Sequence, residues 1–485
     1  MSVGLESRFN ILSCSPLDLK SQGQIVASET NHRKQRLVAS RYNIHSTTPD
    51  GKLIVWNTLT GSISTFDKEN YKQIKKMLRR SGCEDSSATR GIVAYLKKRG
   101  FLVPEGSDEY RLFQMKFGRQ HYRDDVLELI LLASEDCNFR CEYCYEDFKR
   151  GTMAPAVRES VKKLVRRRAP HIKGLSIAWF GGEPLYGWDA IEDLAPYCKK
   201  IAEEFGLHYY SNMTTNGYLL EHERAKKLLK WGVRHYQVTV DGLPCDHDQK
   251  RPTREGGGTF SRIFDNLKTL RDFKNEDFVM DLRVNFDRDS CDRLDGFIEM
   301  VGGEFGGDSR FKLRLRSVGR WGGENDDNLN ICEKDKAKET SYRLIRQAGA
   351  IGVGSCDDLK YINRFGGSAC YASRPFNFII GANGQIMKCT VDLDKKDRNI
   401  IGYLDRDGHM SLDQIKLSAW TEPAFDKDKG CQKCVVLPVC QGISCPQIRM
   451  DEDRSPCIPQ RSNAKRDLLL MNEFGKSAKK LIVKI

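Results

Sequence analysis

Strand-like and helix-like patterns alternate along residues 125–320 of the 485-residue chain, and this alternation constrains the fold more than any other sequence feature. Apolar runs with β character are separated by stretches in which apolar residues recur at helical spacing. The expected strands are Val126–Leu132, Leu175–Trp179, Leu207–Asn212, His235–Val240, Phe278–Phe286 and Phe311–Arg316. Helical crossovers between strands imply a parallel α/β sheet. Six such units are fewer than the eight of a closed barrel, so we expect an open, partial (β/α)6 barrel with its chemistry on the loops after the strands.

Two further segments flank the predicted barrel. Residues 40–115 contain short β-like runs around a Pro49–Gly51 turn, followed by two helical patterns, and predict a small winged-helix-like unit. Residues 355–460 are rich in Cys, Gly and Asp and contain little periodic helix, so we expect metal to organise their core. The predicted domains are 1–120 (winged-helix-like), 121–330 (partial barrel) and 331–485 (cysteine-rich).

Charge and hydropathy limit the possible locations and partners. No apolar run approaches the roughly 20 residues of a membrane helix, and Met1–Leu12 lacks the apolar core of a signal peptide. We therefore expect a cytoplasmic protein that does not bind membranes. The net charge of +13 is compatible with nucleic acid, acidic peptides or an anionic cofactor. Basic runs such as Lys162–Arg168 are interpreted as solvated helix faces.

The chain has 17 cysteines, and a reducing cytosol disfavours disulfides. Ten of them lie in two clusters, at 137–144 and 370–457, a pattern typical of metal ligation. Cys137, Cys141 and Cys144 follow the first expected strand with the spacing C-x₃-C-x₂-C. Three thiolates can hold three irons of a [4Fe–4S] cluster, which leaves the fourth iron open to a chelating ligand. A zinc site is the alternative, but zinc sites normally close with a fourth Cys or His, and none lies nearby in sequence.

With Tyr143 before the last cysteine, this stretch resembles the radical S-adenosylmethionine (SAM) superfamily, whose signature is C-x₃-C-x-aromatic-C. The resemblance continues after the next three strands, at Phe180–Pro184, Thr214–Gly217 and Thr239–Gly242. It implies that Glu183 pairs with the SAM ammonium and that adjacent glycines let the backbone approach the ligand. The implied SAM-binding residues are Tyr143, Gly181, Gly182, Glu183, Thr215, Asn216, Thr239 and Asp241.

Two further features add candidate contacts. Arg314 and Arg316 alternate with leucines along the last expected strand, so an arginine face can point into the barrel toward the SAM carboxylate. Solvent is the alternative for that face. His247 and Arg251 lie in a stretch that resembles relatives of this superfamily, and they are candidate substrate or cofactor contacts. No catalytic residue is identified.

The C-terminal cysteines resemble the SPASM extension of the superfamily, with the pattern C-x₉₋₁₅-G-x₄-C, a gap, C-x₂-C-x₅-C-x₃-C, a gap and a last Cys. One departure is that Cys440 and Cys445 are separated by four residues instead of three. The resemblance implies two auxiliary [4Fe–4S] clusters. One would be held by Cys431, Cys434, Cys440 and Cys457, and the other by Cys370, Cys389 and Cys445. Cys356 or a substrate could complete the second cluster, and a zinc ribbon is the alternative for Cys431–Cys457.

The N-terminal unit resembles the leader-recognition domain fused to many peptide-modifying radical SAM enzymes. Such domains bind a precursor's leader as an added strand at a sheet edge. The alternatives are an inert extension or a nucleic-acid-binding winged helix, although nucleic acid is not the expected partner.

These resemblances imply an oxidoreductase-type enzyme that cleaves SAM reductively to a 5′-deoxyadenosyl radical, which then abstracts hydrogen from a substrate. We expect a maturase that installs a thioether or carbon–carbon crosslink in a ribosomally made precursor peptide, with a flavodoxin- or ferredoxin-type one-electron reductant. The alternatives are anaerobic sulfatase-maturing-type modification, peptide epimerisation, small-molecule radical dehydrogenation and a noncatalytic iron–sulfur module. Sulfatase-maturing enzymes carry Asp where Thr390 follows Cys389 here, which counts against that assignment.

Overall fold

The computed structural model describes residues 36–79, 90–273, 276–354, 363–393, 396–454, 456–474 and 482–483. The chain divides into two compact units, and neither is continuous in sequence. Unit 1 comprises Met1–Tyr122, Cys356–Ser373 and Glu422–Ile485. Unit 2 comprises Arg123–Ser355 and Arg374–Thr421.

Unit 2 is built on a ten-stranded mixed sheet with the order β11-β10-β9-β8-β7-β6-β12-β13-β14-β15. The six predicted strands are present and parallel, and the predicted α/β class is confirmed. They are β6 (Val126–Ser134), β7 (Gly174–Gly181), β8 (His208–Thr215), β9 (Val233–Thr239), β10 (Val279–Phe286) and β11 (Phe311–Ser317). The sheet continues with β12 (Asn377–Ile380), parallel to β6, and with antiparallel β13 (Gln385–Met387), β14 (Ile400–Leu404) and β15 (Met410–Leu412).

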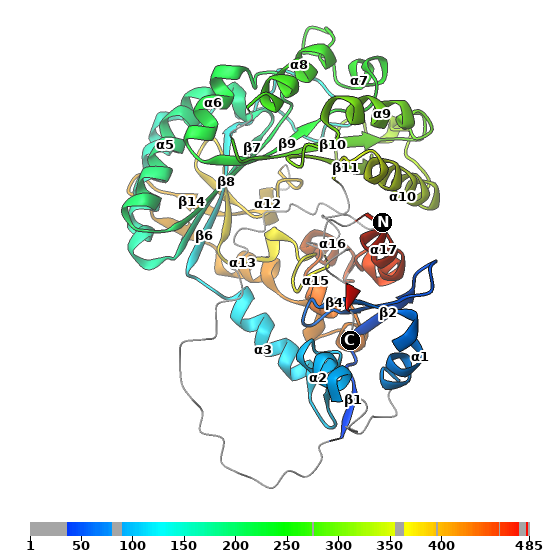
Figure 1. Ribbon diagram of the computed structural model, residues 1–485. Helices are drawn as coiled ribbons and strands as arrows, with labels where there is room; N and C mark the ends of the chain where they lie inside the picture. The colour runs from blue at the N-terminus through cyan, green and yellow to red at the C-terminus, as the bar shows by residue number, and fades with distance from the viewer. Residues whose placement is uncertain are drawn as a thin grey trace. The chain divides into compact units, whose positions relative to one another are not determined.

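Helices cover one face of this sheet (Figure 1). They are α4 (Pro155–Arg168), α5 (Trp188–Glu204), α6 (His222–Lys230), α7 (Pro244–Lys250), α8 (Phe260–Arg271), α9 (Leu294–Phe305) and α10 (Lys334–Ala350), with α12 (Lys396–Asn399) and α13 (Gln414–Thr421) beside the antiparallel strands. Along β10 the fully buried Leu282 and Val284 alternate with Asp281, Arg283 and Asn285. Because successive side chains point to opposite faces, the apolar core lies under the helices and the inner face is polar.

Four inner-face side chains from adjacent strands form one polar network. The Tyr210 hydroxyl lies 2.7 Å from His235 Nδ1, His235 Nε2 contacts the Asp281 carboxylate, and Arg314 pairs with that carboxylate at 2.5 Å. Burial alone would raise the pKa of Asp281, but Arg314 and His235 outweigh it and hold the pKa well below its ordinary value. Arg314 therefore does lie on the inner face, where Asp281 holds its guanidinium.

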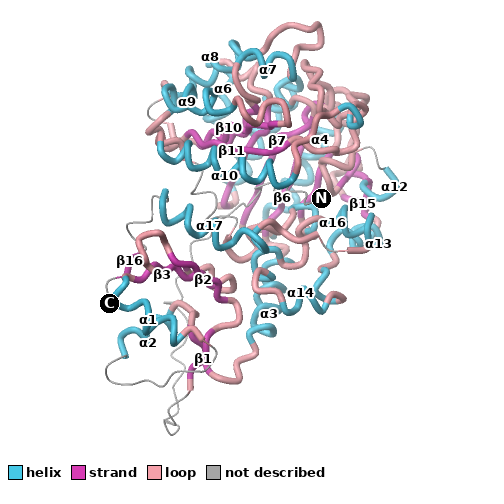
Figure 2. Tube along the Cα trace, turned by 90° about the vertical axis from the view of Figure 1, so that its right-hand side faces the viewer, coloured by secondary structure: helices cyan, strands magenta, loops and turns pink. Residues whose placement is uncertain are grey.

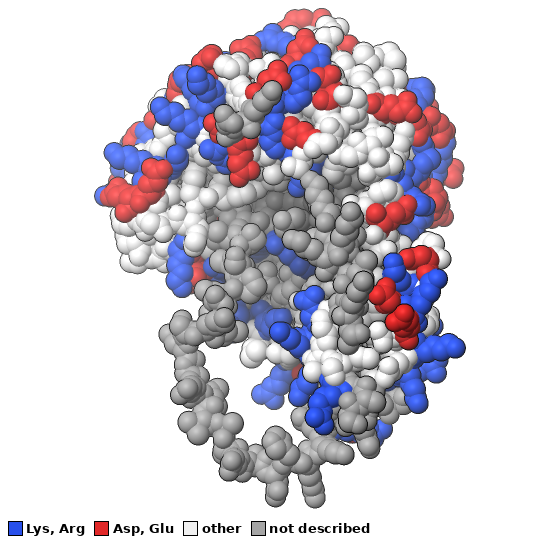
Figure 3. Space-filling model, in the orientation of Figure 1, with Lys and Arg blue, Asp and Glu red and all other residues white. Residues whose placement is uncertain are grey.

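The surface charges of unit 2 are intermixed. Blue and red side chains alternate over its outer helices (Figure 3). In the basic run of α4, Lys162 pairs with Asp193 at 2.6 Å and Arg166 pairs with Glu204 at 2.5 Å. These pairs agree with the interpretation of that run as a solvated helix face. Within the described residues, the structure contains no helix with the length and apolar character of a membrane span.

Unit 1 contains a four-stranded sheet with the order β16-β4-β3-β2 (Figure 2). Its strands are β2 (Asn43–Thr47), β3 (Leu53–Asn57), β4 (Ile63–Phe66) and β16 (Ile482–Val483), and β1 (Leu37–Ala39) pairs separately with β5 (Leu102–Pro104). The N-terminal helices are α1 (Lys68–Met77), α2 (Arg90–Lys98) and α3 (Glu109–His121). Apolar residues of β3, α1 and α2 share one core, which includes Val55, Ile74 and Leu96.

The C-terminal part of unit 1 consists of short helices followed by one longer helix. It contains α14 (Lys429–Lys433), α15 (Leu437–Cys440), α16 (Pro446–Glu452) and α17 (Gln460–Phe474). A second core joins it to the N-terminal part, because Phe113 and Phe117 of α3 pack edge-on against Phe425. The helix α17 contacts β2 and β3 of the sheet.

Candidate radical SAM site

The three cysteines of the first cluster lie on the loop after β6, and a second segment pairs with that loop. Arg140 N donates to the Pro252 carbonyl at 3.0 Å, and Phe139 forms a β-bridge with Thr253. Glu142 N also donates to a carbonyl of this segment, that of Lys250, at 3.0 Å. The segment that follows α7 therefore fixes the backbone of the cysteine loop. Sequence reasoning flagged this stretch but missed this role, which depends on tertiary pairing.

The chemistry of the three thiols suits a cationic cluster. Cys137 is buried, and Cys141 and Cys144 are half-buried. Burial raises the pKa of Cys144 to about 12 and raises that of Cys137, with a further contribution from Glu183. Thiols in such surroundings ionise when a metal compensates the negative charge.

The three thiols do not gather around a position for a single metal ion. In the part of the chain that the structure describes, no three His, Cys, Asp or Glu side chains converge on one ion. The cysteines of a [4Fe–4S] cluster each bind a different iron, so they surround the cluster instead of meeting at one point. The residues present fit such a cluster on the loop 137–144.

The paired glycines after β7 pack against the chain that leads into this loop. Gly181 has φ +128°, and a Cβ there would lie 2.0 Å from the Ser134 carbonyl oxygen. A Cβ on Gly182 would lie 2.7 Å from the Asp136 carbonyl oxygen. Only glycine allows this approach. The glycines therefore hold the end of β7 against the residues just before Cys137, a role that was not anticipated.

Glu183 joins the ends of β7 and β8. Its fully buried carboxylate accepts hydrogen bonds from Leu185 N at 2.9 Å, Thr215 Oγ1 at 2.7 Å and Asn216 N at 2.7 Å. Burial raises the pKa of Glu183 in spite of these donors. The Asn216 side chain in turn donates to Asn138 Oδ1 at 2.8 Å, on the cysteine loop. The structure thus brings Glu183, Thr215 and Asn216 together beside the cysteines, and their SAM-binding roles remain predictions.

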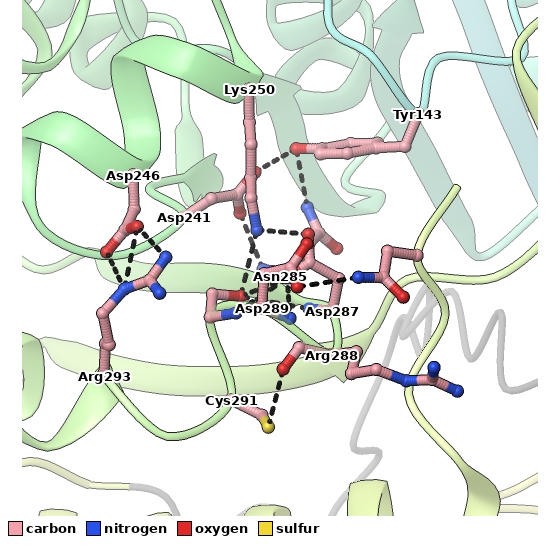
Figure 4. Close-up of polar contacts among 12 residues, drawn as sticks. Tyr143, Asp241, Asp246, Lys250, Asn285, Asp287, Arg288, Asp289, Cys291 and Arg293 are labelled. Carbon is pink, nitrogen blue, oxygen red and sulfur yellow. Dashed lines mark hydrogen bonds and ion pairs between the residues drawn. The ribbon is translucent and has the colours of Figure 1, made fainter. Parts of the chain in front are cut away.

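Tyr143 reaches the ends of β9 and β10 (Figure 4). Its hydroxyl donates to Asp241 and accepts from Arg251 Nη1 at 2.7 Å and from Asn285 Nδ2 at 3.1 Å. Asn285 N also donates to Asp241 Oδ1 at 2.7 Å. Sequence reasoning missed Asn285, although its place on the polar face of β10 could have revealed it. Thr239 is buried at the end of β9, opposite Arg283 in the strand register.

A buried ion pair lies beside this group. Lys250 Nζ is 2.5 Å from Asp287 Oδ2 and donates to Ser290 Oγ at 3.0 Å (Figure 4). The pair links the end of α7 to the loop after β10. Because the Lys250 carbonyl accepts from Glu142 N, the pair also supports the cysteine loop.

His247 supports the backbone of Asp241 from a buried position. The imidazole is fully buried, its Nδ1 accepts from Asp241 N at 3.0 Å, and its Nε2 lies 3.1 Å from Thr259 Oγ1. Burial, followed by the nearby Arg251, holds the pKa of His247 well below its ordinary value. Of the two residues proposed as contacts, Arg251 donates to Tyr143 and His247 accepts from Asp241, and their roles as substrate or cofactor contacts remain predictions.

Four C-terminal cysteines, Cys431, Cys434, Cys440 and Cys457, belong to unit 1. Burial raises the pKa of Cys440 to about 12, with contributions from Cys434 and Cys457, and burial and Asp428 raise that of Cys431 to about 12. The arrangement fits a four-cysteine cluster. Cys370 and Cys445 belong to unit 1 and Cys389 to unit 2, while Cys356 lies outside the described residues. The ligand assignments remain predictions.

Comparisons with known proteins agree with this geometry. The profile of the Radical SAM superfamily matches residues 131–301. Residues 131–301 are a radical SAM domain. Enzymes of this superfamily use SAM and a [4Fe–4S] cluster, so the expected enzyme class and cofactor types are confirmed at the level of the superfamily.

Two curated relatives are informative. The radical SAM cyclopropyl synthase TigE of Paramaledivibacter caminithermalis is 23% identical over 274 residues, 50% of this chain and 56% of the relative. The chain thus spans about half of TigE. A cysteine-type anaerobic sulfatase-maturating enzyme of Clostridium novyi is 22% identical over 330 residues, 64% of this chain and 86% of the relative.

A solved structure shows the same fold. A histidine-tagged form of anSMEcpe with bound AdoMet superimposes with a TM-score of 0.53 at 20% identity, over 73% of this chain and 98% of that chain.

Proposed function

We propose that this chain is a radical SAM maturase that modifies a ribosomally made precursor peptide, installing a thioether or carbon–carbon crosslink. The observation that carries the proposal is the fixed cysteine loop. Its backbone is paired with residues 250–254, and Glu183, Thr215, Asn216 and Asp241 surround its cysteines at the ends of parallel strands. The second cysteine group in unit 1 supports a SPASM-type enzyme.

The chain's own residues would bind the cluster, orient SAM and shield the site from solvent. Cys137, Cys141 and Cys144 would hold the cluster, and Glu183 and Asp241 lie where they could orient SAM. When bound, the reduced cluster and SAM supply a carbon radical that abstracts hydrogen. Glu183 and Asp241 are fully buried, so bulk water does not reach their carboxylates at this end of the sheet.

The remaining partners and domains are proposed on the same basis. Residues 1–120 would recognise the leader, 121–330 would perform the chemistry and 331–485 would carry the auxiliary clusters, in the cytoplasm and with a flavodoxin- or ferredoxin-type reductant. The likeness to a sulfatase-maturating enzyme supports modification of a polypeptide. Sulfatase-type proton transfer is disfavoured, because Thr390 follows Cys389 and the nearby Asp392 is buried and paired with Arg398 at 2.5 Å.

The test is anaerobic reconstitution followed by iron counting and assay of 5′-deoxyadenosine. We expect about twelve irons per chain, and about four fewer in the Cys137/Cys141/Cys144→Ala variant, which should form no 5′-deoxyadenosine. Cys245→Ala, which removes an exposed and scattered thiol, is the matched control and should behave like the wild type.

The substrate is tested by co-expression with short open reading frames adjacent to the gene. A crosslink removes two hydrogen atoms from the peptide, which mass spectrometry detects. Formation of 5′-deoxyadenosine without modification of any such peptide would refute the peptide proposal and leave the radical SAM assignment intact.

A further inference from the structure

Two cysteines outside the predicted clusters lie against each other in unit 2. Cys291 is on the loop after β10 (Figure 4), and Cys332 is on the segment that leads into α10. Both are free thiols, and their residues are 0% and 6% exposed. The Cys332 thiol donates a hydrogen bond to the Cys291 sulfur. Burial, followed by the neighbouring Cys291, raises the pKa of Cys332 to about 11.

Hydrogen bonds on both sides of the thiols hold their two segments together. Arg288 N donates to the Asn330 carbonyl at 3.0 Å, and the Asn330 side chain donates to Asp289 Oδ1 at 2.7 Å. On the other side, Lys336 Nζ lies 2.8 Å from Asp292 Oδ2. The closeness of the two thiols is therefore fixed by the contacts around them.

The same two segments both support the cysteine loop, and they meet at Glu142. Glu142 N donates to the Lys250 carbonyl at 3.0 Å, and the Lys250 side chain is held by Asp287 of the loop after β10. The Glu142 carbonyl accepts a hydrogen bond at 3.0 Å from Asn325 Nδ2, on the stretch that leads to Cys332. A bond between the two thiols would therefore tie together the two supports of the cysteine loop.

We propose that Cys291 and Cys332 are a site of reversible oxidation, at which a hydroperoxide converts the two thiols into a disulfide that holds the cysteine loop in place. Hydrogen peroxide is little larger than water, so it suits a site that is almost closed. Lys336 also donates to the Cys291 sulfur and places a cation beside the pair, in the kind of surroundings where thiols react.

The reaction balances with peroxide as the oxidant. One sulfur attacks a peroxide oxygen, which breaks the O–O bond and gives a sulfenic acid and water. The second sulfur then attacks the first and releases another water. The two sulfurs lose two electrons, which the peroxide oxygens take up. Two small-molecule thiols reverse the reaction by exchange and leave as their own disulfide. In a reducing cytosol such disulfides are usually transient and redox-sensing.

The disulfide is tested by treating the reconstituted full-length chain with a graded series of hydrogen peroxide. The remaining thiols are alkylated, and the chain is digested with trypsin without reductant. Trypsin releases residues 289–293 and 321–334 as separate peptides with one cysteine each. We expect mass spectrometry to detect these peptides joined, at about tenfold less peroxide than oxidises Cys198. Cys198 is the matched control, because it is a fully buried thiol of the same unit.

The effect on the cysteine loop is measured by hydrogen exchange in the Cys137/Cys141/Cys144→Ala variant, whose loop holds no cluster and forms no disulfide of its own. After peroxide treatment, residues 137–144 should exchange about threefold more slowly, because the cross-link restrains the supports of the loop. A thiol reductant should reverse the change, and adding Cys332→Ser should abolish it.

The joined peptides are sought in the wild-type chain, so this result does not depend on the folding of a variant. Failure to detect them, or their formation only after Cys198 is oxidised, would overturn the site. Joined peptides without slower exchange of residues 137–144 would overturn its role in holding the loop. Neither readout requires SAM cleavage or a peptide substrate, so a failure of the proposed function is seen separately.

Discussion

Removing the cation of the buried Lys250–Asp287 pair should destabilise unit 2 more than removing an exposed one. The two side chains are only 7% and 8% exposed, and their charged atoms lie 2.5 Å apart. Breaking a buried pair from one side costs about 3–5 kcal/mol. Ser290 and the backbone of Asp289 still donate to Asp287 Oδ1, so we place Lys250→Met at the lower end, about 3 kcal/mol.

The assay is urea unfolding followed by tryptophan fluorescence and far-UV circular dichroism. Lys227→Met, which removes a cation from the exposed pair with Glu192, is the control and should cost about 0–1 kcal/mol. The double variant Lys250→Met/Asp287→Leu should recover most of the loss, because it leaves no unpaired buried charge. A loss below about 1 kcal/mol for Lys250→Met would refute the reasoning.

The pH dependence provides a second check on the same pair. Burial alone would raise the pKa of Asp287, but the hydrogen bonds from Lys250 and Ser290 outweigh it, so the pKa lies below the ordinary value of 3.8. The stability that this carboxylate contributes is therefore complete above pH 3.8 and is lost as the pH falls through the folded-state pKa. The difference between the wild type and Lys250→Met should shrink over the same range.

Three further substitutions test other parts of the molecule. His247→Leu leaves the Asp241 N–H without its acceptor and should cost about 1–3 kcal/mol in urea unfolding. Because the pKa of His247 is lowered by burial, wild-type stability should fall below pH 6.5, and this slope should weaken in the variant. Gly181→Ala places a Cβ 2.0 Å from a backbone oxygen of the neighbouring chain segment, so we expect loss of the folded protein or a much lower melting temperature. Arg461 Nη1 lies 2.6 Å from Cys457 Sγ. Arg461→Gln should lower the reduction potential of a cluster bound there, measured by redox titration with electron paramagnetic resonance, and an unchanged potential would argue against that ligand set.

Local patterns predicted the parallel strands and the cysteine loop because both depend on residues close in sequence. The strand β12 was missed because it is only four residues long and joins β6 from nearly 250 residues away. Hydrophobic periodicity cannot indicate such a partner. The division into two discontinuous units could not be predicted from the sequence for the same reason. Cores such as that of Phe113 and Phe425 join parts of the chain that are distant in sequence.

In the candidate site, too, the sequence could not predict contacts between single residues that are distant in the chain. Motif spacing located Glu183 and Asp241, but it could not show that His247 is buried beneath Asp241 or that residues 250–254 pair with the cysteine loop. The alternation of β10 did contain the signal for Asn285. Its partners Tyr143 and Asp241 come from other elements, so only the assembled sheet identifies it as part of the site.

The division of unit 1 across both ends of the chain sets an order for folding during synthesis. Thr65 of β4 leaves the ribosome 407 residues before its partner Asn472. At about 5–20 residues per second, the N-terminal sheet waits roughly 20–80 s for α17. All of unit 2 is made during that interval and can fold first. Until α17 is made, the face of β2 and β3 that it will contact stays exposed, so a cellular chaperone would protect this face longest. Premature termination before α17 would leave the sheet of the first-made residues without its partner helix.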